Sequence, residues 1–312
     1  MAPAKSKKTV AEIVTETILK RMQEGTFSWH QAWNLQDIPR NYVSGKAYRG
    51  INLWLLRTSE YKSPFWLTYQ QAIQAGGHVR EGEHPRMIVF MKPNIRKVKE
   101  LETGEEVLQF GKPVFRYYRV FNEEQCEGVP SHAMPELKMN ARIETADRLY
   151  AAMGDQAPRL ERGRPAYVPA IDVITMPDIK EYESTETYYR SLFHETGHWT
   201  GAKNRLAREG IVRFDMFGSH QYSKEELVAE FSAAMLASLY GFHEKILDMN
   251  VGYLQSWMTR LEKDPDLIIG AASQAQKAVE FVLTTAGTSW EEVLGEMKAE
   301  APAAASGAGV LA

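Results

Sequence analysis

The sequence predicts an α+β protein in which a mixed first half precedes a mostly helical second half. Segments rich in β-branched and aromatic residues, typical of strands, lie in the first half at 86–91 ("RMIVFM") and 114–122 ("VFRYYRVFN"). After residue 180, by contrast, long stretches have apolar residues at helical spacing. With 312 residues, of which 44% are hydrophobic and 25% charged, the composition is that of a globular protein and excludes disordered and membrane classes.

The elements are expected in the following order. Apolar residues at helical spacing predict a helix from Val10 to Gln23, and Gly25 supplies a stop. Residues 92–113, between the two expected strands, have the composition of a hairpin and loop. Six prolines within 123–180 predict an irregular connection there. Helices are then expected over 184–199, 223–242, about 250–262 and 270–284.

These patterns predict a domain at 9–125, a Pro-rich connection at 126–180 and a helical domain at 181–300, with disordered tails at 1–8 and 301–312. The start of the chain lacks the apolar segment of a secretory signal. Cys126 is the only cysteine, so a disulfide framework is excluded and a cytoplasmic location is expected. Any metal must therefore be held by histidines and carboxylates.

Charge is divided unevenly along the chain. The first 121 residues carry 19 Lys and Arg against 11 Asp and Glu, whereas the remaining residues carry 18 against 29. This asymmetry favours a polyanionic partner for the first half, nucleic acid being the commonest. The alternative is a basic face that is simply solvated.

The segment "HETGH" at 194–198 indicates a metal site on a helix. His194 and His198 are four residues apart, so both imidazoles lie on one face and can reach a single ion. A catalytic zinc takes three protein ligands and leaves a position for water, whose proton Glu195 would accept. The alternative is a pair of half-exposed histidines. Gly197 counts against it, because a glycine inside a helix usually marks the close approach of a backbone or a substrate.

The third ligand is expected on the next helix, where Glu226 and Glu230 share a face. We assign Glu226 as the ligand and Glu230 as the residue that bonds a ligand histidine, and the reverse assignment stays open. Another explanation of Glu226 is a capping box with Ser223.

Aromatic and basic residues alternate in the first half, as sequence-tolerant binding of single-stranded DNA requires. Candidate DNA-binding residues are Trp29, Trp33, Arg40, Tyr42, Lys46, Tyr48, Arg49, Arg57, Trp66 and Tyr69. The alternative is that most of these aromatic residues form the core of the domain.

Several motifs in one order resemble a known family. "NYVSGKAYRGIN" at 41–52, "WLTYQQA" at 66–72 and "GGHVREGE" at 76–83 resemble the N-terminal domain of ArdC-type antirestriction proteins of conjugative plasmids. "YYRSLFHETGHWTGAKNRLAR" at 188–208 and "YSKEELVAEFSAAML" at 222–236 resemble the zincin-like metallopeptidase domain of that family. The resemblance implies a domain that binds single-stranded DNA non-specifically, joined to a metallopeptidase-like domain. The expected cofactor is one divalent metal, zinc.

Three functions follow as alternatives. The first half could coat incoming plasmid DNA and shield it from restriction, with weaker binding to duplex DNA. The protein could instead be a DNA-directed protease acting on a restriction subunit or a DNA-bound protein. Alternatively, the metal could be purely structural. Tyr188, Tyr222 and His220 lie near the motif as candidates to stabilise an oxyanion.

Overall fold

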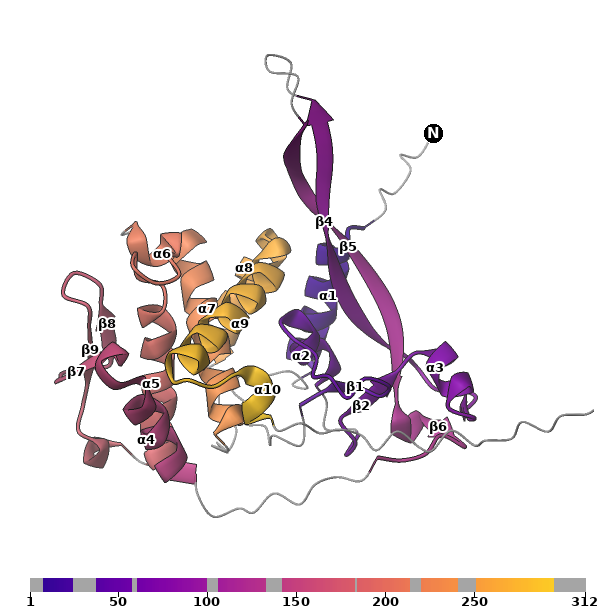
Figure 1. Ribbon diagram of the computed structural model, residues 1–312, viewed down its shortest axis with the longest axis horizontal. Helices are drawn as coiled ribbons and strands as arrows, with labels where there is room; N and C mark the ends of the chain where they lie inside the picture. Colours follow the sequence, from indigo (N-terminus) through magenta and orange to yellow (C-terminus); the bar gives the residue numbers. More distant parts are fainter. Residues whose placement is uncertain are drawn as a thin grey trace, which may run out of the picture.

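The computed structural model describes residues 8–24, 38–57, 61–99, 106–132, 142–182, 184–213, 220–240 and 251–294. The helices of the second half gather on one side and the first half on the other (Figure 1). A long ribbon of two strands, β4 (Arg86–Lys99) and β5 (Glu106–Asn122), projects from the body. This arrangement confirms the α+β class predicted from the sequence.

The five predicted helices begin and end close to their expected positions, and the described residues also contain helices that were not predicted. The described residues contain α1 (Val10–Gln23), α2 (Ile51–Leu56), α3 (Tyr69–Gln74), α4 (Arg142–Met153), α5 (Thr185–Trp199), α6 (Glu209–Val212), α7 (His220–Leu239), α8 (Val251–Lys263), α9 (Asp266–Thr285) and α10 (Trp290–Val293). Helix α1 has the predicted bounds. It begins with a capping box, in which Thr9 and Glu12 each accept the other's backbone N–H.

The strands form three sheets within the described residues. The largest has the order β1–β2–β5–β4, in which β1 and β2 are parallel and the other neighbours are antiparallel. Two antiparallel strands, β3 and β6, form a second sheet, and β7–β9–β8 form a third. The remaining bounds are β1 (Arg40–Asn41), β2 (Phe65–Leu67), β3 (His78–Val79), β6 (Cys126–Glu127), β7 (Arg159–Arg162), β8 (Ala166–Val168) and β9 (Val173–Met176).

Strands β4 and β5 continue far into the segment that was expected to contain a hairpin and loop. They pair from Arg86 opposite Val120 to Lys99 opposite Glu106, with a register shift between Lys92 and Asn94. Pro93 occupies the shift, because proline has no backbone N–H to donate to the ladder. The hairpin predicted within 92–113 is therefore present, but its strands are longer than expected, because Pro93 interrupts the pairing only locally.

The expectation of an irregular connection at 126–180 is also corrected. Helix α4 and the sheet β7–β9–β8 lie within it. The prolines stand at the ends of these short strands: Pro158 precedes β7, Pro165 and Pro169 flank β8, and Pro177 follows β9. Proline is tolerated at strand ends, so here it delimits regular elements rather than excluding them.

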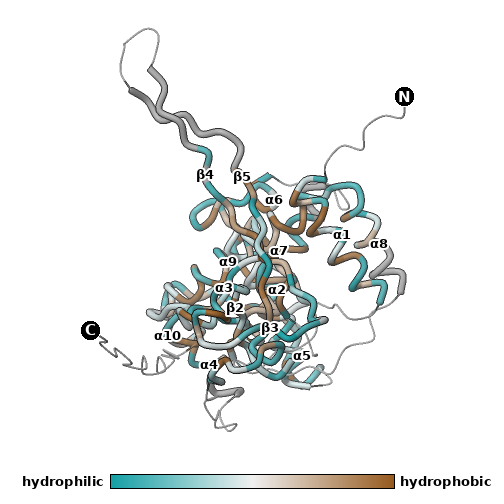
Figure 2. The backbone as a smooth tube through the Cα atoms, turned by 90° about the vertical axis from the view of Figure 1, so that its right-hand side faces the viewer, coloured by the Kyte–Doolittle hydropathy of each residue, from teal (hydrophilic) through white to brown (hydrophobic). Residues whose placement is uncertain are grey.

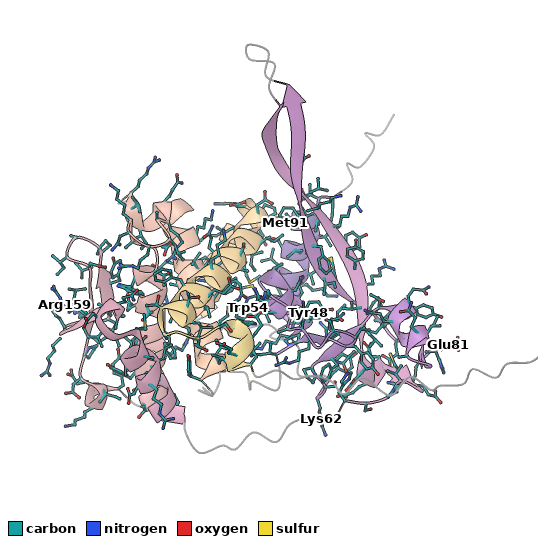
Figure 3. All side chains as sticks on the ribbon, in the orientation of Figure 1. Tyr48, Trp54, Lys62, Glu81, Met91 and Arg159 are labelled. Carbon is teal, nitrogen blue, oxygen red and sulfur yellow. The ribbon has the colours of Figure 1, made fainter. Side chains whose placement is uncertain are left out.

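The main hydrophobic core of the described residues contains side chains from both halves of the chain. It includes Ile18 of α1, Trp54 of α2 and Phe231 of α7, all fully buried. The rings of Trp54 and Phe231 stack with their centroids 4.5 Å apart. Figure 3 labels Trp54 where the first half meets the helices of the second, and Figure 2 shows apolar stretches of α2 and β2 within the body, below the projecting ribbon. The predicted domains thus share their interior.

None of the helices in the described part of the chain is both long and apolar enough to cross a membrane. The predicted tails, 1–8 and 301–312, lie outside the described residues apart from Lys8.

Candidate metal centre

Helices α5 and α7 pack closely enough to bring the predicted ligands together. A Cβ atom at Gly197 of α5 would lie 3.0 Å from the Cα of Ala229 and 3.3 Å from the Cβ of Ser232, both in α7. Only glycine leaves room for this approach. The expectation that Gly197 marks a close backbone contact is confirmed.

The structure brings His194, His198 and Glu226 together. The two Nε2 atoms are 3.2 Å apart. Glu226 Oε2 lies 3.7 Å from Nε2 of His194, and its Oε1 lies 3.5 Å from Nε2 of His198. One possible ligand atom from each of the three residues lies within 4.8 Å of the other two. These separations suit a common ion, because metal–donor bonds of about 2 Å separate neighbouring ligands by slightly more than 3 Å.

Glu230 lies behind His194 rather than beside Glu226. Its Oε1 is 3.7 Å from Nδ1 of His194, the ring nitrogen that faces away from the shared space, and its Oε2 is 3.3 Å from Nη2 of Arg190. This geometry favours Glu226 over Glu230 as the third ligand. The capping-box explanation of Glu226 is wrong, because α7 begins at His220 and Ser223 lies inside the helix.

A residue that the sequence analysis missed supports His198 in the same way. Oε1 of Glu225 lies 3.4 Å from Nδ1 of His198, and both oxygens of Glu225 accept hydrogen bonds from Arg208. Arg208 is buried and also donates to the carbonyl of Gly197 and the hydroxyl of Thr200. Each histidine is therefore backed by a carboxylate, and each carboxylate by an arginine.

Protonation follows from these contacts. Burial raises the pKa of Glu225, but hydrogen bonds from His198 and Arg208 outweigh it and bring the pKa to about 2. The ionised carboxylate can only accept, so His198 donates through Nδ1 and its Nε2 lone pair faces the shared space. Burial lowers the pKa of His194 to about 4, which keeps that imidazole neutral. The two Nε2 atoms, 3.2 Å apart, can share a hydrogen bond, or both can offer lone pairs to a cation between them.

A proton competes with a metal for His198. Burial alone would lower the pKa of His198, but the hydrogen bond to Glu225 and the charge of Glu226 outweigh it and raise the pKa above its usual value. Metal binding requires the unprotonated ring.

Glu195 of α5 contacts the sheet β7–β9–β8. It is buried, and its Oε2 accepts the backbone N–H of Tyr167 in β8 at 2.7 Å. Burial raises the pKa of Glu195, which brings this carboxyl closer to the range of a general base at neutral pH. Strand β8 falls in the segment that was expected to be irregular, so this contact could not be predicted from the sequence.

Tyr167 is itself fixed by a network at the end of α5. Its hydroxyl donates to Asp172 Oδ1 at 2.8 Å, and Asp172 also pairs with Arg205. Arg205 in turn donates to the carbonyl of Trp199 and stacks over its ring at 4.2 Å. This network couples the position of Glu195 to that of the helix end.

Of the three candidates for stabilising an oxyanion, the structure describes the side chain of one. Tyr188 packs edge-on against Tyr182 and Tyr189, with centroid distances of 5.4 Å and 5.3 Å. The side chains of Tyr222 and His220 lie outside those that the structure describes.

Four of the eight predicted DNA-binding residues that the structure describes are buried. Arg40, Tyr42, Tyr48 and Trp66 are buried, so no ring face is free to stack on a base and the Arg40 guanidinium is enclosed. Nη2 of Arg40 donates to the carbonyl of Leu294, and the Tyr42 hydroxyl donates to that of Pro130. The prediction that these four residues bind DNA is therefore corrected. They have structural roles, which was the alternative stated for the aromatic residues. Trp29 and Trp33 lie outside the described residues.

The other four candidates differ in their surroundings. Arg49 forms ion pairs with Glu280 of α9 and Glu291 of α10, so it fastens the two halves together. Arg57 is half-buried, and its carbonyl accepts from Arg21. Lys46 and Tyr69 are exposed.

Comparison with known proteins agrees with this architecture. Residues 8–121 match the N-terminal domain of anti-restriction factor ArdC, and residues 144–274 match a zincin-like metallopeptidase family. The metal-free crystal structure of the antirestriction ArdC protein from plasmid R388 is 34% identical, with a TM-score of 0.69. The match covers 89% of this chain and 98% of that one. The chain belongs to the ArdC family of antirestriction proteins.

Other relatives extend the comparison for this ArdC-family chain. The Mn(II)-bound structure of the R388 protein is 32% identical, with a TM-score of 0.68 and coverage of 89% and 98% of the two chains. DNA primase TraC of Escherichia coli is 35% identical over 297 residues, which are 90% of this chain and 27% of the primase. An uncharacterized protein of Sinorhizobium fredii is 32% identical over 283 residues, 88% of this chain and 91% of that protein. The chain thus spans about a quarter of the primase. The zincin-like match, the Mn(II)-bound relative and the ligand cluster together support a divalent metal.

Proposed function

We propose that this protein binds single-stranded DNA without sequence preference and shields incoming plasmid DNA from host restriction. We further propose that its second half is a peptidase centre that depends on a divalent metal, zinc in the cytoplasm. The convergence of His194, His198 and Glu226 carries the metal proposal. Membership of an antirestriction family supports the DNA proposal, as does the excess of positive charge in the first 121 residues.

The donor set suits zinc. Two neutral imidazoles and one carboxylate form a three-ligand set found in catalytic zinc sites. The carboxylates of Glu225 and Glu230 behind the histidines set their orientation and raise their basicity. A bound zinc ion would polarise a peptide carbonyl and lower the pKa of water.

Glu195 is the proposed general base. It would accept a proton from the attacking water and pass it to the amine nitrogen of the leaving group. The hydrogen bond from the Tyr167 N–H holds one carboxylate oxygen and leaves the other for this transfer.

Two alternatives remain for the metal centre. In one, the protein is a DNA-directed peptidase that cleaves a restriction subunit or a DNA-bound protein, and cleavage itself gives protection. In the other, the ion only stabilises the packing of α5 on α7. The buried general-base carboxyl favours a catalytic centre, because a purely structural site needs no such group.

Plasmid transfer into restricting and non-restricting recipients separates DNA shielding from proteolysis. The protein, its Glu195→Gln variant and an empty control are compared, with Glu186→Gln of the same helix as the matched variant. We expect Glu195→Gln to protect as well as the parent. Loss of protection by Glu195→Gln alone, with intact folding and DNA binding, would instead establish proteolysis as the protective activity.

Cleavage of casein and of a purified restriction enzyme tests the peptidase centre directly. With zinc present, Glu195→Gln should cleave about 100- to 10,000-fold more slowly than the parent, the usual contribution of a general base. If chelation lowers the melting temperature but neither substrate is cleaved by the parent, the structural-metal alternative holds.

A further inference from the structure

The ribbon of β4 and β5 is anchored firmly at its base. Ile88 and Val120 on one face pack with Trp66 in a small hydrophobic cluster. Val89 on the other face belongs to the main core, and its backbone N–H and carbonyl both bond the side chain of Asn52, at 2.7 and 2.8 Å. The backbone of the ribbon is therefore held in place at the base from which the exposed side chains begin.

One face of the ribbon, beyond its base, exposes a row of apolar and basic side chains. Phe90 lies opposite Arg116, Lys92 opposite Val114, and Tyr118 opposite Ile88. Because side chains alternate along each strand and paired residues share a face, these exposed residues project on the same side. We call the set Phe90, Lys92, Val114, Arg116 and Tyr118 the ribbon face.

The aromatic rings of the ribbon face are exposed and next to each other. Phe90 is 51% exposed and Tyr118 47%. Their ring centroids are 5.3 Å apart in an edge-to-face arrangement. Exposed aromatic and aliphatic side chains in one patch mark an interaction surface, because exposure to water is unfavourable for them.

The charge of this surface indicates the partner. Lys92 and Arg116 are exposed and form no ion pair with any residue in the described part of the chain. The paired segments 86–92 and 114–120 contain four basic residues, Arg86, Lys92, Arg116 and Arg119, and no Asp or Glu. A second copy of this surface would bring like charges together, whereas a polyanion would neutralise them.

We propose that the ribbon face is a binding platform for single-stranded DNA, on which unpaired bases stack against Phe90 and Tyr118 while phosphates bind Arg116 and Lys92. Stacking needs bases whose ring faces are free, so a duplex could use only the two cations. The inference rests on the proposed DNA-binding function and adds its location. It also explains how the first half can offer rings to bases although Tyr42, Tyr48, Trp54, Phe65 and Trp66 are buried.

The test measures binding of the full-length protein to a fluorescein-labelled, mixed-sequence 20-nucleotide strand and to the matching duplex by anisotropy. The variants are Phe90→Ala and Tyr118→Ala. Tyr117→Ala is the matched control, because Tyr117 has the same 47% exposure on the same strand but projects from the opposite face.

We expect Phe90→Ala and Tyr118→Ala each to weaken single-strand binding at least about fivefold, the effect of losing one stacked base, with duplex binding unchanged. Tyr118→Phe should bind like the parent. Arg116→Gln should make the slope of log Kobs against log salt shallower by about 0.7, whereas the aromatic variants should leave that slope unchanged.

Other outcomes overturn the inference in distinguishable ways. If the parent binds and the ribbon variants bind equally well, the platform lies elsewhere and the proposed DNA-binding function stands. Equal losses for Tyr117→Ala would reject the assignment of the face, and equal losses on duplex would reject stacking. Concentration-dependent self-association that Phe90→Ala abolishes would make the face a dimer interface. If the parent itself binds no single strand, the proposed function fails first.

Discussion

At the scale of single residues, the two histidines of the candidate metal centre depend on groups that lie behind them. One of these groups is Glu225, a buried carboxylate that contacts His198 on one side and the buried Arg208 on the other. A carboxylate in this position sets both the ring orientation and the tautomer, which decides where the lone pair points.

Glu225→Gln tests this role. It keeps the shape but removes the charge, so His198 loses its fixed orientation and basicity while Arg208 loses its partner. We expect zinc affinity to fall about 10- to 100-fold, measured by competition with a chelator. Glu262→Gln, an exposed change on α8, should leave the affinity unchanged. An unaltered affinity in Glu225→Gln would show that Arg208 and Glu225 serve only the packing.

The sequence could predict some of these residues and not others. His194, Glu195 and His198 follow from the helical period, because a spacing of four on one helix fixes their relative positions. Glu226 followed from the same period on a second helix. Glu225 could not be predicted, since its contact with Arg208 joins a helix to an irregular segment seventeen residues earlier in the chain, which no local pattern encodes.

At the scale of elements, the close approach of α5 and α7 determines whether the ligands meet. Gly197 permits it, and the carbonyl of Gly197 also accepts from Arg208. Glycine at position 197 therefore lowers the helix propensity of α5 but permits its close packing on α7.

Gly197→Ala should destabilise the protein although alanine favours helices. The gain of about 1 kcal/mol in propensity is smaller than the cost of forcing a Cβ against the α7 backbone, about 1–3 kcal/mol and more where backbone must move. Gly270→Ala in α9 is the control, because its Cβ would meet only Lys224 Cε at 3.8 Å and should raise stability by up to about 1 kcal/mol. Urea unfolding measures both, and equal stabilisation of the two would contradict the packing argument.

Elements were predicted best where the period is long and uninterrupted. Helix α1 and the helices around the metal centre satisfy this condition. Short strands β7–β9 do not, since three or four residues between prolines carry no period that can be distinguished from a loop. The buried aromatic residues of the first half could not be predicted for a related reason. Composition alone does not distinguish an aromatic residue in the core from one on the surface.

At the scale of the whole molecule, the shared core predicts that both halves unfold together. Trp54→Ala removes a fully buried ring from the contact with Phe231 and should cost about 3–5 kcal/mol. Calorimetry should give one transition in the parent, shifted as a whole by zinc. Tyr69→Ala, outside this core, should change little. Two transitions, with zinc shifting only the second, would show that the halves are independent.

The shared core also bears on how such a protein can be passed between genomes. A recombination event that separated the halves would expose the apolar faces around Trp54 and Phe231 and leave each fragment prone to aggregation. Selection should then keep the two halves together as one unit, even within much longer polypeptides. The longer relatives that match this chain across both halves are what such a constraint would leave behind.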